Sequence, residues 1–201
     1  MLTDNQIEIL CTKMQIPLVG IFFKDELPKK LEYNKGYIIN IQDSHDGEGL
    51  ENNGTHWTAF YVAKYKNGNV EPIYFDSYGM PPPEDVKRFV KQNTNKQLPF
   101  TTKDVQSLMS SVCGWYCCAF LYAITNPHFK TGDLYQDVDT FINMFEDLNK
   151  GHDFKKNEYI LKLFFRSSDE STRKLHPIDI DIKEQEDNPN VMKIPIDTRM
   201  I

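Results

Sequence analysis

The chain carries, at residues 105–118, the stretch VQSLMSSVCGWYCC, which holds three of its four cysteines. From Ser111 onward, apolar residues recur at steps of three and four, and this spacing predicts a buried helix that ends at Asn126. Cys113 then lies in the first turn of that helix. A thiol in this position meets the free backbone N–H groups and the positive end of the helix dipole, and both favour the thiolate. Cys113 is therefore the first candidate for a nucleophile.

Two β-rich runs upstream of this stretch predict a central sheet. They are GYIINI at 36–41 and HWTAFYVAKY at 56–65. The second run is followed by the turn signal Asn67-Gly68 and by a returning strand, VEPIYFDSY at 70–78. This pattern favours a mainly antiparallel sheet.

Helical spacing of apolar residues predicts four helices besides the one that begins near Cys113. The first of them follows Thr3 and Asp4, which are typical of a helix N-terminus. The expected elements outside the two runs and the hairpin are helices at 5–14, 82–92, 138–150 and 154–167, and a strand at 98–106. The predicted class is α+β, with helices that flank the sheet.

His56 and Asp76 lie at the same end of the predicted hairpin and form a second candidate pair. An aspartate can orient an imidazole that exchanges a proton with a thiol, although each residue type alone is more often structural. With a two-residue turn, His56 faces Gly79, and Asp76 lies about three residues away, roughly 10 Å along the strand. A hydrogen bond between the pair therefore requires a wider turn or a bulge, for which Pro72 in the returning strand is a candidate position.

Gln106 lies seven residues before Cys113 and offers a side-chain amide. This amide and the Cys113 backbone N–H are candidate donors to a developing oxyanion. Cys117 and Cys118 lie one turn into an apolar helix, so we expect them to be small buried hydrophobes. A zinc site made of these cysteines and His128 would have the wrong ligand spacing.

The composition excludes several other classes of protein. The 201 residues are 40% hydrophobic, which is enough for one sizeable core. The formal net charge of −6 argues against a protein that holds nucleic acid by phosphate neutralisation. We expect no signal peptide and no membrane span, and hence reduced cysteines in a cytosolic compartment. The motifs of P-loop, dinucleotide-binding, serine-hydrolase and zincin sites do not occur.

A change in composition after residue 166 predicts two parts, a catalytic domain at 1–166 and an acidic tail at 167–201. The tail holds half of the net negative charge. Its low apolar content around 183–190 indicates disorder, whereas its alternating segments PIDIDI and MKIPID indicate strands that pack on the core. Both alternatives stay open.

The motifs resemble those of a known family. THW, FDSYG, a single glutamine and CGWYC follow one another and contribute, in that order, His56, Asp76, Gln106 and Cys113. This order resembles the adenovirus-type cysteine proteases, the branch shared with the proteases of ubiquitin-like modifiers. The stretch IPLVGIFFKDELP at 16–28 also resembles the opening of relatives found in virophages and in Polinton-type transposons. The resemblance covers about residues 7–125.

The resemblance implies a papain-like, adenain-like cysteine protease fold with its nucleophile at the N-terminus of a buried helix. In that arrangement Cys113 is the nucleophile, His56 the base, Asp76 its orienter and Gln106 an oxyanion-hole donor. The implied function is an endopeptidase that cleaves capsid or other virion precursor proteins during particle maturation, in the host cell cytoplasm or inside the virion. We expect a monomer that is not secreted and has no membrane or nucleic-acid partner.

Two departures from the family pattern affect the expected site. Many of these relatives carry a histidine after CG, where this chain has Trp115. We expect Trp57, Gly114 and Trp115 to contact the substrate, and the two indole rings to narrow the cleft so that small residues such as glycine pass. The adenovirus enzymes are basic and are stimulated by DNA and by a short viral peptide, whereas this chain is acidic. We therefore expect no cofactor and no stimulation by DNA, and a peptide activator stays open.

Two alternatives share the fold. A protease that removes ubiquitin-like modifiers would use the same four residues on another substrate. A catalytically inactive binding module would keep the fold without the site, and the presence of all four residue types argues against it.

Overall fold

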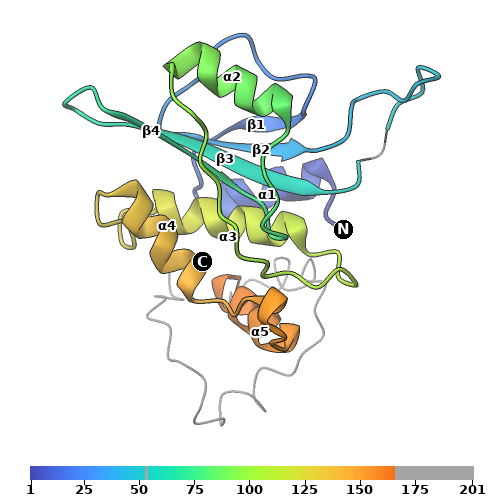
Figure 1. Cartoon of the computed structure of the whole chain (residues 1–201), viewed down its shortest axis with the longest axis vertical. Helices are drawn as coiled ribbons and strands as arrows, with labels where there is room; N and C mark the ends of the chain where they lie inside the picture. Colours follow the sequence, from blue (N-terminus) through green and yellow to red (C-terminus); the bar gives the residue numbers. More distant parts are fainter. Residues whose placement is uncertain (53, 166–201) are drawn as a thin grey trace.

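A four-stranded sheet in the order β1-β2-β3-β4 forms the centre of the computed structural model (Figure 1). The structure describes residues 1–52 and 54–165. The strands are Leu18–Phe23 (β1), Gly36–Asn40 (β2), Trp57–Lys64 (β3) and Val70–Phe75 (β4). The helices are Asp4–Lys13 (α1), Glu84–Thr94 (α2), Cys113–Thr125 (α3), Leu134–Asn143 (α4), the 3-10 turn Leu148–Lys150 (η1) and Phe154–Phe164 (α5). The α+β class predicted from the sequence is confirmed.

Strand β1 is the element that the sequence pattern does not predict. All six residues of its run LVGIFF are half-buried. The run contains no polar residue, so it lacks the alternation of polar and apolar residues that marks a strand with one face in solvent. β1 pairs with β2 in parallel, whereas β2–β3 and β3–β4 are antiparallel, so the sheet is mixed.

The turn between β3 and β4 is one residue wider than the two-residue turn expected from Asn67-Gly68. The Tyr65 N–H donates to the Asn69 carbonyl at 2.9 Å, so the three residues at 66–68 form the loop. Gly68 has a φ of +84°, the left-handed conformation that a glycine tolerates at the end of such a loop.

The wider turn changes the register of the hairpin. The observed pairing continues from Lys64 with Val70 to Ala59 with Phe75 without a shift, and the same register extended past the end of β4 would place His56 opposite Tyr78. Asp76 is thereby one residue closer to His56 than the two-residue turn implies. The wider turn, with no bulge at Pro72, therefore removes one of the three residues of offset. The rest of the approach comes from the turn after β4, where the Asp76 carboxylate accepts the Tyr78 N–H and the Asp76 backbone carbonyl accepts the Gly79 N–H.

Helices cover both faces of the sheet (Figure 1). α2 packs on one face over a cluster of aromatic and aliphatic side chains, and α1 and α3 lie on the other face. β3 is buried along seven of its eight residues because both of its faces are covered. α3 is buried from Cys113 to Ile124, as expected for a helix that is apolar all round. The larger core thus fixes the start of α3 beside the start of β3.

The segment at 98–106 does not form the expected strand. It makes one isolated bridge, between Phe100 and Tyr74 of β4. Its later part turns toward the residues after β4, where the Ser77 carbonyl accepts the Gln106 N–H at 3.1 Å. Because these backbone groups bond to a turn, they do not continue a ladder beside β4.

The helix expected at 138–150 is shifted toward the N-terminus. α4 begins at Leu134, where the Asp133 carboxylate caps the helix by accepting the Gln136 N–H at 3.0 Å. It ends at Asn143, and the remaining expected residues include the separate turn η1. The N-cap, which the apolar spacing does not register, sets this boundary.

Among the helices of the described residues, none has both the length and the apolar character needed to cross a membrane. The domain boundary predicted at 166 and the tail at 167–201 lie outside the described residues.

Candidate active site

Cys113 is the first residue of α3, close to the helix start that the apolar spacing predicts. Its side chain is buried, and its Sγ accepts a hydrogen bond from the Trp57 backbone N–H at 3.5 Å. Trp57 is the first residue of β3, so the thiol lies where a helix start meets a strand start. No described side chain caps the N-terminus of α3, which leaves its first N–H groups available to negative charge near the sulfur.

Gly114 allows α1 to pack closely against the first turn of α3. A Cβ at this position would lie 3.2 Å from Ile7 Cδ1 and 3.3 Å from Leu2 Cβ. Both contacts are tighter than ordinary van der Waals distances, so a larger residue would push the nucleophile's turn away from α1.

His56 directly precedes β3 and Asp76 directly follows β4. His56 Nε2 and Asp76 Oδ1 are 2.9 Å apart, and both side chains are buried. The same Oδ1 accepts the Tyr78 N–H at 2.8 Å, which orients the carboxylate. Gly79 closes this turn with a φ of +68°, and a Cβ there would lie only 2.5 Å from the Thr102 carbonyl oxygen. The FDSYG sequence therefore bends in a way that aims Asp76 at the imidazole.

The Cys113 side chain is also close enough to the His56 imidazole to raise its pKa. Because Asp76 engages Nε2, Nδ1 is the ring nitrogen left for the thiol. Burial acts to lower the pKa of His56, but the hydrogen bonds with Asp76 and Cys113 and the charges of both raise it to about 9. The imidazole is therefore protonated at neutral pH, and its positive charge favours a thiolate beside it.

Gln106 is buried, and all of its side-chain groups are engaged within the protein. Its Oε1 accepts a hydrogen bond from Ser77 Oγ at 2.8 Å. Its Nε2 donates to Tyr78 Oη at 3.0 Å and to the Ser110 carbonyl at 2.9 Å. Since both amide hydrogens are in use, a bond from Gln106 to an oxyanion requires one of these two bonds to break.

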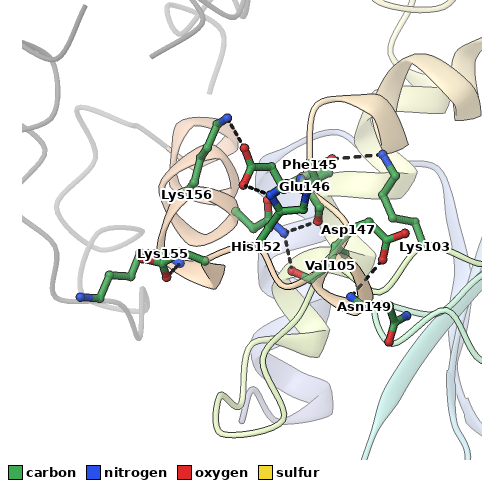
Figure 2. A network of polar contacts seen from close by, with 11 residues as sticks. Lys103, Val105, Phe145, Glu146, Asp147, Asn149, His152, Lys155 and Lys156 are labelled. Carbon is green, nitrogen blue, oxygen red and sulfur yellow. Dashed lines mark hydrogen bonds and ion pairs between the residues drawn. The ribbon is translucent and has the colours of Figure 1, made fainter. Parts of the chain in front are cut away.

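The backbone just before Gln106 is anchored by the C-terminal part of the described chain (Figure 2). The Val105 carbonyl accepts a hydrogen bond from Nδ2 of Asn157, a fully buried residue of α5, at 3.0 Å. The Lys103 ammonium donates to the Phe145 carbonyl at 3.1 Å. α5 and the residues that precede it therefore hold the segment at 98–106, which carries Gln106.

The three residues expected to contact the substrate are all buried. The Trp115 ring has no exposed surface and packs edge-to-face on Phe165, with ring centroids 4.7 Å apart. Trp57 is 6% exposed, and its indole Nε1 donates to the Leu2 carbonyl at 2.9 Å. Because α3 is buried on all sides, its side chains and Gly114 face protein. Cys113 itself is 2% exposed, less than Trp57, so burial in the free chain does not decide which of these residues contact a substrate, and their role in narrowing the cleft stays a prediction.

Tyr78 is the residue of this site that the sequence interpretation missed. It is half-buried, and its ring stacks on the His56 imidazole with centroids 4.6 Å apart. Its hydroxyl accepts the Gln106 amide hydrogen. Its place in FDSYG, two residues after Asp76, was a signal for this role, but the hairpin register and the turn after β4 together bring it onto His56.

The remaining cysteines are buried thiols, as expected. Burial raises the pKa of Cys117 well above its ordinary value. A hydrogen bond with Cys11, whose Sγ is 3.8 Å away, and then burial raise the pKa of Cys118 in the same direction. Cys117 and Cys118 therefore stay protonated at neutral pH.

Two surface pockets lie apart from the candidate residues. One, of about 450 Å³, lies between the end of β3 and the C-terminal end of α3, and the other, of about 470 Å³, lies between β4 and α4. None of the four residues named as catalytic candidates lines either pocket.

The chain matches no model of a protein family and no curated protein sequence. The function of the site is therefore inferred from the arrangement of its own residues.

Proposed function

We propose that the chain is a cysteine endopeptidase with a papain-like catalytic arrangement. The observation that carries the proposal is the position of the His56 imidazole. It is bonded to the Asp76 carboxylate at 2.9 Å through Nε2, and it lies beside the Cys113 thiol, which accepts the N–H of the next residue, Trp57, at 3.5 Å and raises the pKa of the imidazole. A buried thiol at a helix N-terminus, an imidazole and an orienting carboxylate are the groups that thiol-based acyl transfer requires.

In the first half of the reaction, the Cys113 thiolate attacks the carbonyl carbon of the scissile peptide bond. A sulfur–carbon bond forms, and the carbonyl electrons move to the oxygen. The His56 imidazolium then gives its proton to the nitrogen of the leaving amine. The carbon–nitrogen bond breaks and leaves a thioester on Cys113.

In the second half, a water attacks the thioester, and the neutral His56 takes up its proton. The acid product leaves, and the thiolate and imidazolium are restored. Asp76 remains ionised throughout, because its task is to hold the imidazole and to stabilise its positive charge.

The proposed substrates are capsid or other virion precursor proteins, which are cleaved during particle assembly in the host cytoplasm. This part rests on the resemblance of the THW, FDSYG and CGWYC motifs to the adenovirus-type proteases. The resemblance implies a protein substrate whose cleavage site is extended and accessible.

The direct test compares the wild-type chain with Cys113→Ala, with capsid precursors co-expressed and their fragments identified by mass spectrometry. We expect new termini with the wild-type chain and none with Cys113→Ala. Cys117→Ala is the matched control, since it removes a thiol from the same helix one turn away, and it should still cleave. Cleavage only of a probe derived from a ubiquitin-like modifier would favour deconjugation, and equal fragments with Cys113→Ala would contradict the proposal.

A further inference from the structure

The hydroxyl group of Tyr78 lies among the reacting groups of the proposed protease. Its ring stacks on the His56 imidazole, with centroids 4.6 Å apart and planes 28° from parallel. Its Oη accepts a hydrogen bond from Gln106 Nε2 at 3.0 Å. Among the charges that raise the pKa of Tyr78, that of Cys113 has the largest effect, which indicates that the hydroxyl lies within electrostatic reach of the sulfur. Of these residues, Tyr78 alone is half-buried, while the other three are buried.

The supply of hydrogen-bond donors at the site distinguishes Tyr78 from Gln106. The two amide hydrogens of Gln106 are given to Tyr78 Oη and to the Ser110 carbonyl. The Tyr78 hydroxyl accepts one of them and, among the described residues, donates its own hydrogen to no acceptor. A phenol carries one donor, so of the side-chain hydrogens of Tyr78 and Gln106 this is the one that a bound substrate can take without breaking a protein hydrogen bond.

Two effects act on this hydrogen, one on its presence and one on its strength as a donor. Burial, the charges of Cys113 and Asp76, and a smaller effect of Asp104 raise the pKa of Tyr78, against the opposing effect of the Gln106 bond. The phenol is therefore protonated over the neutral range. A hydroxyl that already accepts a hydrogen bond is also polarised and donates more strongly.

We propose that Tyr78 is a further catalytic residue, whose O–H donates a hydrogen bond to the oxyanion that forms when Cys113 attacks the scissile carbonyl. The proton stays on the phenol throughout. The proton delivered to the leaving amine comes from His56, and the negative charge on the oxygen returns to the carbonyl when the carbon–nitrogen bond breaks. Gln106 then acts through Tyr78, by orienting and polarising the hydroxyl. The inference rests on the proposed acyl-transfer function.

The test is Tyr78→Phe, which retains the ring on His56 and removes only the hydroxyl. We expect kcat to fall about 100-fold with little change in KM, the size of effect seen when one oxyanion donor is lost. A peptide aldehyde, whose adduct with Cys113 carries an oxygen at the oxyanion position, should bind correspondingly more weakly. Alkylation of Cys113 by iodoacetamide forms no oxyanion, so its rate and pH profile should be unchanged. Tyr135→Phe, which removes an exposed hydroxyl bonded to Pro72 outside the site, is the matched control.

A double mutant separates direct action from positioning. If Tyr78 touches the oxyanion, Tyr78→Phe should still lower kcat when it is added to Gln106→Ala. No further loss in that background would show that Tyr78 only positions the glutamine and would overturn the inference. An increase in kcat for Tyr78→Phe would overturn it as well, because it would mean that the hydroxyl obstructs the oxyanion position.

Experiments on the wild-type chain distinguish a failure of the proposed function from a failure of this inference. If it cleaves no protein or peptide and binds no peptide aldehyde, the proposed function fails and this inference falls with it. If it is active and Tyr78→Phe is equally active, the inference alone fails.

Discussion

At the scale of single residues, the electrostatic state of His56 governs the chemistry of the site. Burial of an imidazole normally disfavours its charged form. Here the bonds and charges of Asp76 and Cys113 outweigh burial, and the pKa of His56 rises to about 9. The imidazole therefore stays protonated across neutral pH and loses its proton on the alkaline side.

The alkaline side of the pH profile provides a test of this state. We expect kcat/KM of the wild-type chain to fall as the pH rises through about 9, because deprotonation of His56 removes the proton needed by the leaving amine. Asp76→Asn removes the charge that helps to raise this pKa, so its alkaline limb should lie at lower pH. The measurement is kcat/KM on one peptide from pH 5 to 10. Identical alkaline limbs in the two proteins would contradict the assignment of Asp76 as the partner that holds the charge.

At the scale of elements, the site lies where the ends of one helix and two strands come together. The start of α3 brings the thiol, the start of β3 brings the imidazole, and the turn after β4 brings the carboxylate and the phenol. The glutamine comes on an irregular segment that α5 anchors through Asn157. The geometry of the oxyanion side therefore depends on a helix far along the chain from the nucleophile.

Asn157 provides a test of this dependence. Its amide donates to the Val105 and Glu146 carbonyls at 3.0 and 2.7 Å, and its Oδ1 accepts the Glu146 N–H at 2.7 Å. Asn157→Ala leaves the buried Val105 carbonyl and the part-buried Glu146 backbone groups without their partner, and an unsatisfied buried group costs about 1–3 kcal/mol. We expect a lower free energy of unfolding in urea titrations, and a lower kcat under conditions where the variant is folded.

The neighbouring Lys156 supplies the control. It lies beside Asn157 on α5 but forms an exposed ion pair with Glu146, so Lys156→Ala should change the free energy of unfolding by less than about 1 kcal/mol. Equal losses of stability in the two variants would contradict the role assigned to the buried amide.

At the scale of the whole molecule, the same imidazole links the stability of the fold to pH. The pKa of His56 is about 9 in the folded chain, against an ordinary value of 6.5. A raised folded-state pKa means that the stabilisation is fully present below about pH 6.5 and is lost as the pH rises through about 9. The sheet, α3 and the turn after β4 all contact this residue, so the loss is felt by the whole domain.

Urea unfolding at pH 6, 8 and 10 measures this link. The contribution of His56 to the free energy of unfolding should decrease by about 3 kcal/mol across that range. The reference is His56→Gln, which cannot carry the charge, and the difference between the two proteins isolates the effect. A difference that grows toward pH 10 would contradict the sign.

The sequence predicted most elements of the fold and missed those that depend on contacts with distant residues. Local signals located most helices and strands, because the spacing of apolar residues reports which face is buried. They did not locate β1, whose residues are evenly half-buried, and they placed α4 too late, because its start depends on the Asp133 cap. They also mistook the segment at 98–106 for a strand, since its backbone groups bond to the turn after β4.

The sequence by itself determined the chemical types and the order of the candidate groups, His56, Asp76, Gln106 and Cys113, and the helix start that carries the thiol. Only the tertiary structure decided which of them meet. A hairpin turn one residue wider than expected, together with the tight turn that follows β4, brought Asp76 within bonding distance of His56 and placed Tyr78 on the ring. The physical reason is that a period of apolar residues encodes local burial, whereas register and donor pairing depend on contacts between residues far apart in the chain.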